Sequence, residues 1–197
     1  MQQISIQVMK RKTIWLIVAL LSALLVSSAQ AQTFGGPEAM KRKVVVGGDF
    51  GLGFYGNNFY FGIAPQAGYR LTRSLEVGVR LGYDLNYYYG NYYYGSYFCH
   101  YFSGSAYANF EVFKGIYLHV EDEELCLLVR GQAINPTAPR WYNSLFVGGG
   151  YRHYASSTSY AFYSILYNLS WDYGYNGSQS SPYASPFVIR VGYCIGL

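Results

Sequence analysis

The chain has little charge and few of the residues that hold metals or perform redox chemistry. Charged residues make up 12% of its 197 residues, and it contains only three Cys and three His. The cysteines have no Cys-x-x-Cys spacing, and the histidines lie in three separate segments, at positions 100, 119 and 153. We therefore expect no metal site and no thiol redox centre. No basic patch suited to nucleic acid is present, so we expect no nucleic-acid partner.

Beyond its first 26 residues the chain also lacks a long hydrophobic run. Spanning a bilayer as a helix takes ~17–25 apolar residues, which excludes a helical membrane protein. Lys10, Arg11 and Lys12 precede the apolar residues 14–26, and Ala29-Gln30-Ala31 follows. This order predicts a secretory signal peptide over residues 1–31, with a short periplasmic segment over 32–42 and a single domain over 43–197. A permanent anchor is the alternative, but the apolar stretch is too short to span.

Aromatic residues and glycine are abundant, with 24 Tyr, 12 Phe and 23 Gly. Along most of the chain apolar residues alternate with small or polar ones, and a period of two predicts β-strands. No segment fits the helical period. Eight strands are expected at residues 43–55, 59–71, 74–86, 97–113, 116–121, 143–153, 159–170 and 187–197.

The clearest strand, at residues 74–86, has two faces of opposite character. One face carries Leu75, Val77, Val79, Leu81, Tyr83 and Leu85, and the other carries Glu76, Gly78, Arg80, Gly82, Asp84 and Asn86. The core of a soluble protein would not put charges and glycines on its inner face, whereas a lipid-facing barrel hides its apolar face by this alternation. We predict an all-β fold, an eight-stranded antiparallel up-and-down transmembrane β-barrel in a bacterial outer membrane. A soluble secreted β-sandwich is the alternative.

The connections between these strands alternate in length. Short turns are expected at 72–73, 114–115 and 154–158, and mostly longer loops at 56–58, 87–95, 122–142 and 171–186. Short periplasmic turns and longer external loops are typical of outer-membrane barrels.

The inward faces carry charges of both signs. We expect a polar network across the lumen, because unpaired charges buried there would be costly. Its expected members are Asp49, Gln66, Glu76, Arg80, Asp84, Glu111, His119, Glu121, Arg152 and Arg190.

Three segments resemble a known family. Phe146-Val147-Gly148-Gly149-Gly150-Tyr151-Arg152, the run from Ile165 to Leu169, and the ending from Ser185 to Gly192 are similar to small outer-membrane barrels of Bacteroidetes-type bacteria. The general shape resembles the eight-stranded OmpA and OmpX barrels. The resemblance implies location and fold rather than a reaction. Arg190, Gly192, Ile195 and Leu197 also resemble the signal read by the barrel assembly machinery, although many such barrels end in Phe.

The tyrosine-rich stretch before the fourth expected strand is the candidate interaction loop. It contains Tyr87, Tyr88, Tyr89, Tyr92, Tyr93 and Tyr94, with Gly, Asn and Ser between them. Such loops offer amphipathic contact area at low entropic cost, which suits a glycan or protein ligand. The alternative is an extended hairpin whose tyrosines form an interfacial aromatic belt.

Two further features leave alternatives open. The acidic run Glu121-Asp122-Glu123-Glu124 is either a solvated loop rim or a holder of divalent cations that bridge lipopolysaccharide. Cys99 and Cys126 both lie near the loop end of their strands, so a disulfide between them is possible, while Cys194 faces inward as a free thiol.

The residues favour a non-enzymatic role without a cofactor. The glycine clusters at 47–48 and 148–150 do not precede a helix and so do not form a dinucleotide site. We expect a barrel that anchors Tyr-rich and acidic loops outside the cell, in a structural or surface-interaction role, with membrane lipid and lipopolysaccharide as neighbours. The alternatives are a lipid A-modifying enzyme with a Ser/His pair, or a narrow channel.

Overall fold

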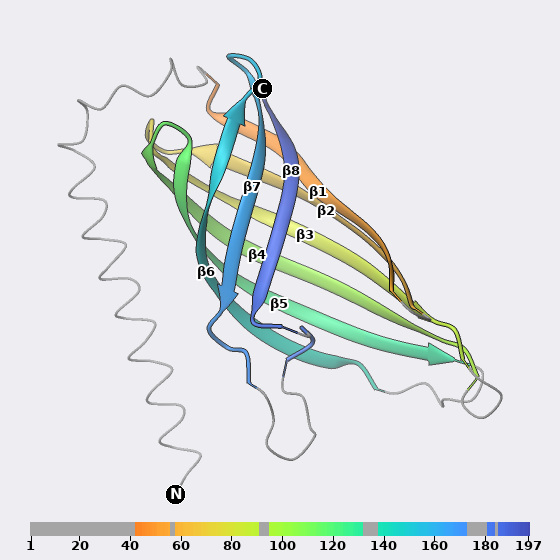
Figure 1. Cartoon of the computed structure of the whole chain (residues 1–197). Coiled ribbons are helices and arrows are strands. Elements are labelled where there is room, and N and C mark those ends of the chain that lie inside the picture. The colour runs from red at the N-terminus through yellow and green to blue at the C-terminus, as the bar shows by residue number, and fades with distance from the viewer. Residues whose placement is uncertain (1–41, 56–57, 91–94, 132–137, 173–180, 184) are drawn as a thin grey trace, which may run out of the picture. The chain divides into compact units, whose positions relative to one another are not determined.

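The described part of the chain is a closed β-barrel. The computed structural model describes residues 42–55, 58–90, 95–131, 138–172, 181–183 and 185–197. Its strands are β1 (Val44–Tyr55), β2 (Asn58–Arg70), β3 (Leu75–Tyr88), β4 (Tyr97–Phe113), β5 (Ile116–Gly131), β6 (Arg140–Tyr154), β7 (Ser159–Asn168) and β8 (Phe187–Gly196). They follow one another around the barrel in chain order (Figure 1), and every neighbouring pair is antiparallel. The expected all-β, eight-stranded antiparallel barrel is confirmed.

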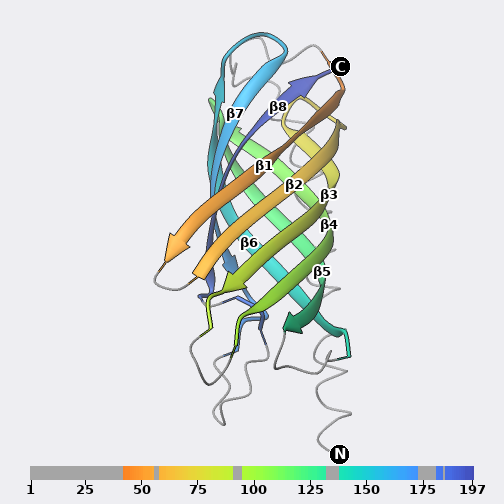
Figure 2. The same cartoon turned by 90° about the vertical axis from the view of Figure 1, so that its right-hand side faces the viewer.

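The strands cross the barrel at a tilt, as closure of a sheet requires (Figure 2). The two ends of the barrel differ. One end, here called the turn end, has the short connections at residues 71–74, 114–115 and 155–158 together with the C-terminal end of β8. The other, the loop end, has the connections from β1 to β2, from β3 to β4, from β5 to β6 and from β7 to β8. No helix among the described residues is long and apolar enough to cross a membrane.

The two faces of each strand are as the alternation predicts. Most outward side chains are apolar, and many of them are exposed, most of all Phe50 at 78% and Ile189 at 73%. On β3, Val79 and Leu81 point out while Glu76 and Arg80 are buried inside. Leu75 is the exception, because it lies on the outward face but is only 8% exposed where β3 leaves the turn.

The tightest turn at the turn end joins β4 to β5. Its two residues, Lys114 and Gly115, have φ angles of 40° and 89°. Two successive residues with positive φ match the right-handed twist of a hairpin. Gly115 suits the second position, since a side chain there would be strained and its Cβ would collide with the carbonyl of Arg152.

Glycines on the inward faces make room for large rings from neighbouring strands. A Cβ at Gly192 would lie 2.5 Å from Cζ of Phe162, and one at Gly78 would lie 2.5 Å from Cζ of Tyr107. Side chains on both strands could not be accommodated at these crossings. Glycine therefore alternates with charge along the inner faces because the lumen is filled by a few large residues.

The strands at the loop end are longer than the sequence predicted on one side of the barrel. The fifth strand, expected to end at Glu121, continues to Gly131, and the sixth begins at Arg140 instead of Asn143. The expected loop 122–142 is therefore wrong. Its first ten residues pair with β4, from Asp122 opposite Ala106 to Gly131 opposite Tyr97.

The ladder that closes the barrel is short. Among the described residues, β1 and β8 have five register pairs, from Val45–Gly196 to Asp49–Gly192. The rest of β1 is in register with β2 alone. In Figure 1 the two strands meet near the C-terminus and diverge toward the loop end.

Candidate functional site

The inward charges gather in two clusters inside the barrel. The first, here called the Glu76 cluster, lies toward the turn end and contains Arg70, Glu76, Tyr107, Arg152 and Tyr160. Nε of Arg70 lies 3.5 Å from Oε2 of Glu76, and Nη2 of Arg152 lies 3.1 Å from Oε1. The Glu76 side chain is only 1% exposed. One buried carboxylate therefore forms ion pairs with two buried guanidinium groups.

Neutral donors also converge on the Glu76 carboxylate. The Tyr107 hydroxyl lies 3.5 Å and the Asn109 amide nitrogen 3.4 Å from Oε1. The Tyr160 hydroxyl lies 3.3 Å from Oε2. Because two oxygens serve five donor side chains, Nε and Nη2 of Arg70 and Nη2 of Arg152 have no aligned hydrogen-bond acceptor. The cluster therefore has more buried positive charge and more donors than its carboxylate can satisfy.

The second cluster, here called the Arg80 cluster, contains Asp49, Arg80, Glu121, Glu123 and Arg190. Arg80 donates two hydrogen bonds to Asp49, from Nε to Oδ2 at 3.1 Å and from Nη2 to Oδ1 at 3.0 Å. Its remaining nitrogen, Nη1, lies 3.8 Å from Glu123 and 4.0 Å from Glu121. Arg190 donates to Oε2 of Glu121. Here three carboxylates face two arginines.

His119 joins the two clusters. Its Nε2 lies 2.9 Å from Oε2 of Glu121, and its Nδ1 lies 2.6 Å from Oδ1 of Asn109, which also donates to Glu76. A chain of polar contacts therefore runs along the lumen from Arg80 to Arg152. His119 is buried and both of its ring nitrogens are engaged.

The other sequence-predicted lumen residues have local partners. Tyr60 donates to Asp84 at 2.8 Å, and the Gln66 amide donates to the sulfur of Cys194 at 3.0 Å. Glu111 accepts from the Tyr154 hydroxyl at 2.5 Å and from the backbone of Gly115 at 3.0 Å. All ten expected residues thus lie inside the barrel, seven of them in or between the two clusters.

Sequence reasoning missed several members of the network. Arg70 and Glu123 are buried members, and Tyr107 and Tyr160 fill much of the space between the charges. The sequence pattern could have predicted that Glu123 points inward, because it lies two residues after Glu121 and so shares its face of the strand. The expectation of an exposed acidic rim at 121–124 is wrong, because Glu121 and Glu123 point inward and only Asp122 and Glu124 face out. No metal-ligand cluster occurs among the described residues.

The possible Cys99–Cys126 disulfide is not formed. Cys99 is opposite Val129 and Cys126 is opposite Phe102 in the β4–β5 ladder. Cys99 is on the inward face with Tyr101, whereas Cys126 shares the outward face with the exposed Phe102. Side chains on opposite faces of a sheet cannot bond, and all three cysteines are free, with Cys194 buried inside as expected.

An aromatic surface covers the loop end of β3 and β4. We call it the aromatic wall, and it consists of Tyr83, Tyr87, Phe98, His100 and Phe102. The rings of Tyr87 and Phe98 stack at 4.4 Å, those of Tyr83 and Phe102 lie 5.1 Å apart, and the Tyr83 hydroxyl bonds to Nδ1 of His100 at 3.1 Å.

The expected tyrosine loop is therefore partly strand. Tyr87 and Tyr88 belong to β3, where Tyr88 stacks on Tyr97 at 4.7 Å on the inward face. Tyr89 follows the strand with its ring edge against Tyr87. Tyr92, Tyr93 and Tyr94 lie outside the described residues.

Part of the connection between β7 and β8 folds over the Arg80 cluster. The Tyr183 hydroxyl donates to Glu123 at 2.6 Å, and the indole nitrogen of Trp171 donates to the Tyr183 carbonyl at 3.0 Å. The Tyr183 ring packs edge-on against Phe146. Burial raises the pKa of the Tyr183 hydroxyl well above its ordinary value, and the negative charge of Glu123 raises it further. The hydroxyl therefore stays a donor and gives Glu123 a short hydrogen bond in addition to its 3.8 Å ion pair with Arg80.

The described barrel is similar to a solved structure. No family model and no curated protein matches the sequence. Among solved structures, the N-terminal β-barrel domain of Pseudomonas aeruginosa OprF is similar, with a TM-score of 0.43 and 14% identity over 79% of this chain and 98% of that chain. The function proposed below therefore rests on the residues of this chain.

Proposed function

We propose that this protein is a non-enzymatic barrel of a bacterial outer membrane that presents the aromatic wall outside the cell for contact with glycans or proteins. The observation that carries the proposal is the reversal of polarity across the sheet. Apolar side chains such as Phe50, Leu81 and Ile189 are exposed, while Glu76 and Arg80 are buried. Hydrocarbon is the surrounding that favours this arrangement, and a barrel is the only sheet that pairs its backbone groups there.

The lumen supports a structural role for the inward charges. Ion pairs, tyrosines and Phe162 occupy the interior, which suits the narrow space inside eight strands. His119 binds Asn109 and Glu121 with its two ring nitrogens, so it is not free to activate a serine.

The aromatic wall supports the contact role. Stacked rings with exposed edges bind sugars and protein surfaces at low entropic cost. The wall lies at the loop end of the two strands on either side of the tyrosine-rich stretch. In the proposed orientation the turn end lies in the periplasm and the wall lies outside.

Epitope tags at the two ends of the barrel test location and orientation. A tag inserted at Gly90, beyond β3, is expected to bind antibody on intact cells. A tag at Ser157, in the β6–β7 turn, is expected to bind only after the outer membrane is opened. Both proteins should fractionate with the outer membrane and migrate differently on gels before and after heating. Recovery in a soluble fraction, or surface labelling at Ser157 alone, would contradict the proposal.

Substitutions in the aromatic wall test the contact role. The Tyr87→Ser and Phe98→Ser double variant should bind immobilised lipopolysaccharide or surface glycoprotein roughly tenfold more weakly, because it loses a stacked pair and its buried area. Binding is measured by surface plasmon resonance with the protein in detergent. Tyr163→Ser, which removes an outward tyrosine of β7, is the matched control and should bind as the parent does. Equal binding by all three proteins would contradict the proposed contact role of the aromatic wall. It would not bear on the proposed location in the outer membrane.

A further inference from the structure

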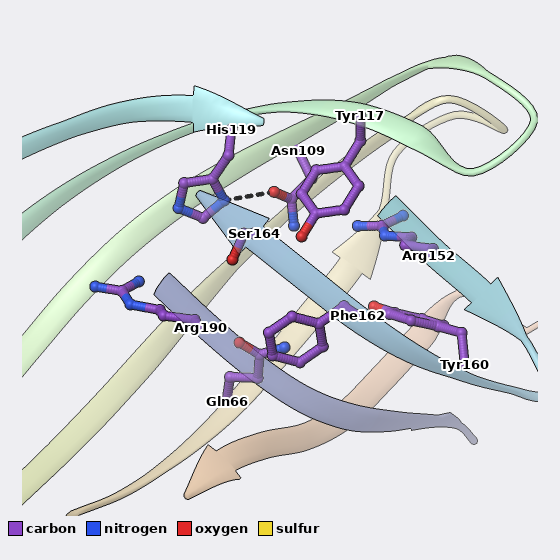
Figure 3. A pocket seen from close by; sticks show the side chains of 9 residues that line it. All are labelled: Gln66, Asn109, Tyr117, His119, Arg152, Tyr160, Phe162, Ser164 and Arg190. Atoms are coloured by element: carbon purple, nitrogen blue, oxygen red, sulfur yellow. Dashed lines mark hydrogen bonds between the residues drawn. The ribbon is translucent and has the colours of Figure 1, made fainter. Parts of the chain in front are cut away.

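A small cavity lies inside the barrel between the two charge clusters. It has a volume of about 20 Å³. A cavity needs roughly 10–15 Å³ to hold a water molecule. This cavity therefore has room for one water molecule or one small ion. Figure 3 shows its lining side chains, which are Gln66, Asn109, Tyr117, His119, Arg152, Tyr160, Phe162, Ser164 and Arg190.

The lining consists of hydrogen-bond donors and positive charge. Arg152 from β6 and Arg190 from β8 lie on two sides of the cavity, with Ser164 of β7 between them in the view of Figure 3. Ser164 and Arg190 are also register partners. None of the nine lining residues is a carboxylate. Glu76 and Glu121 contact these arginines but do not line the cavity.

Of the nine lining residues, Arg152 is the one with a buried side-chain nitrogen that lacks an aligned acceptor among the described residues. Its side chain is 3% exposed. Nη2 has no aligned hydrogen bond, and the carboxylate that it approaches is shared with Arg70 and three neutral donors. A buried charge without a full counter-charge is strongly destabilising, so an added negative charge would be stabilised at this position.

We propose that the cavity is a binding site for a monatomic anion of the chloride class, held between Arg152 and Arg190. The hydroxyl of Ser164 and the amide of Gln66 line the site as further donors. Carboxylate and phosphate ligands are too large for this volume. A water molecule fits but does not supply the missing charge. The site is internal and does not depend on the proposed role of the barrel at the cell surface.

Halide-dependent stability tests the proposal. The full chain, produced in a bacterium and purified in detergent, is exchanged into sodium chloride, sodium bromide or sodium gluconate at equal ionic strength, and its thermal unfolding is recorded. At a halide concentration about a hundred times the Kd, the midpoint should be roughly 5 °C higher than in gluconate. Equal midpoints in all three salts would overturn the proposal and leave a water molecule in the cavity.

Variants assign the effect to the cavity. Ser164→Val fills the space without touching an ion pair and should abolish the difference between halide and gluconate. Arg152→Gln should abolish it as well. Arg140→Gln, the same change at an exposed position of the same strand, should keep it in full. A halide effect that survives in Ser164→Val would place the ion elsewhere and overturn the proposal.

Bromide also gives a direct readout that does not depend on the stability of any variant. Crystals of the parent protein grown in bromide should show an anomalous peak inside the barrel between Arg152 and Arg190. Density without an anomalous signal at this position would show water and overturn the proposal.

Discussion

Replacing Glu76 by glutamine is expected to lower the free energy of unfolding by about 3–5 kcal/mol, or to prevent the barrel from folding. The substitution keeps the size of the side chain and removes its charge. Arg70 and Arg152, both buried, would then face each other's charge without the carboxylate that now lies between them. Urea unfolding of the protein refolded into lipid vesicles, followed by tryptophan fluorescence, measures the loss.

Glu124 provides the matched control. It lies on β5 but faces outward and is exposed, and its carboxylate accepts a hydrogen bond from the amide of Asn143 at 3.1 Å. Glu124→Gln should change the free energy of unfolding by no more than about 0.5 kcal/mol. Similar losses in the two variants would show that the inward position of Glu76 is not what makes its charge important.

Arg80→Met is expected to have a comparable effect through the opposite charge. Methionine occupies a similar volume but leaves Asp49 without its two hydrogen bonds and Glu123 without its nearest cation. We expect a loss of about 3–5 kcal/mol because three carboxylates then share the single arginine Arg190. The same unfolding experiment measures it.

A second substitution should recover part of this loss. In the Arg80→Met background, Asp49→Asn removes the carboxylate that was left unpaired, so the two changes should be non-additive by roughly 0.5–3 kcal/mol. Arg130→Met, at an exposed position of β5, is the control and should be nearly neutral. Strict additivity of the Arg80 and Asp49 substitutions would mean that the pair contributes no coupling.

Alternation alone predicted most of this barrel, because in a closed sheet each strand is amphipathic along its own length. On β3 the charged and apolar residues separate cleanly between the two faces, and the observed register with β2 and β4 keeps faces of one kind together. The expected bounds of the fourth strand, 97–113, match the observed ones. Here local sequence and tertiary structure favour the same arrangement.

Prediction failed where the local pattern and the tertiary environment differ. The run from Glu121 to Glu124 has four acids in succession, which locally favours solvent. In the barrel the alternate members Glu121 and Glu123 meet Arg190, Arg80 and Tyr183, which come from distant parts of the chain. Arg70 and the inward tyrosines were missed for a related reason, since the partner of a lumen side chain depends on how the sheet closes. Spacing along one strand does not contain that information.

The short ladder between β1 and β8 also determines how the barrel closes and opens. These strands are the first and last of the sheet, so their pairing encloses the longest stretch of chain and carries the largest entropic cost of closure. Five register pairs then compensate for that cost, against sixteen between β4 and β5. We therefore expect closure to be a late step of folding, and we expect these two strands to separate more readily than β4 and β5 do.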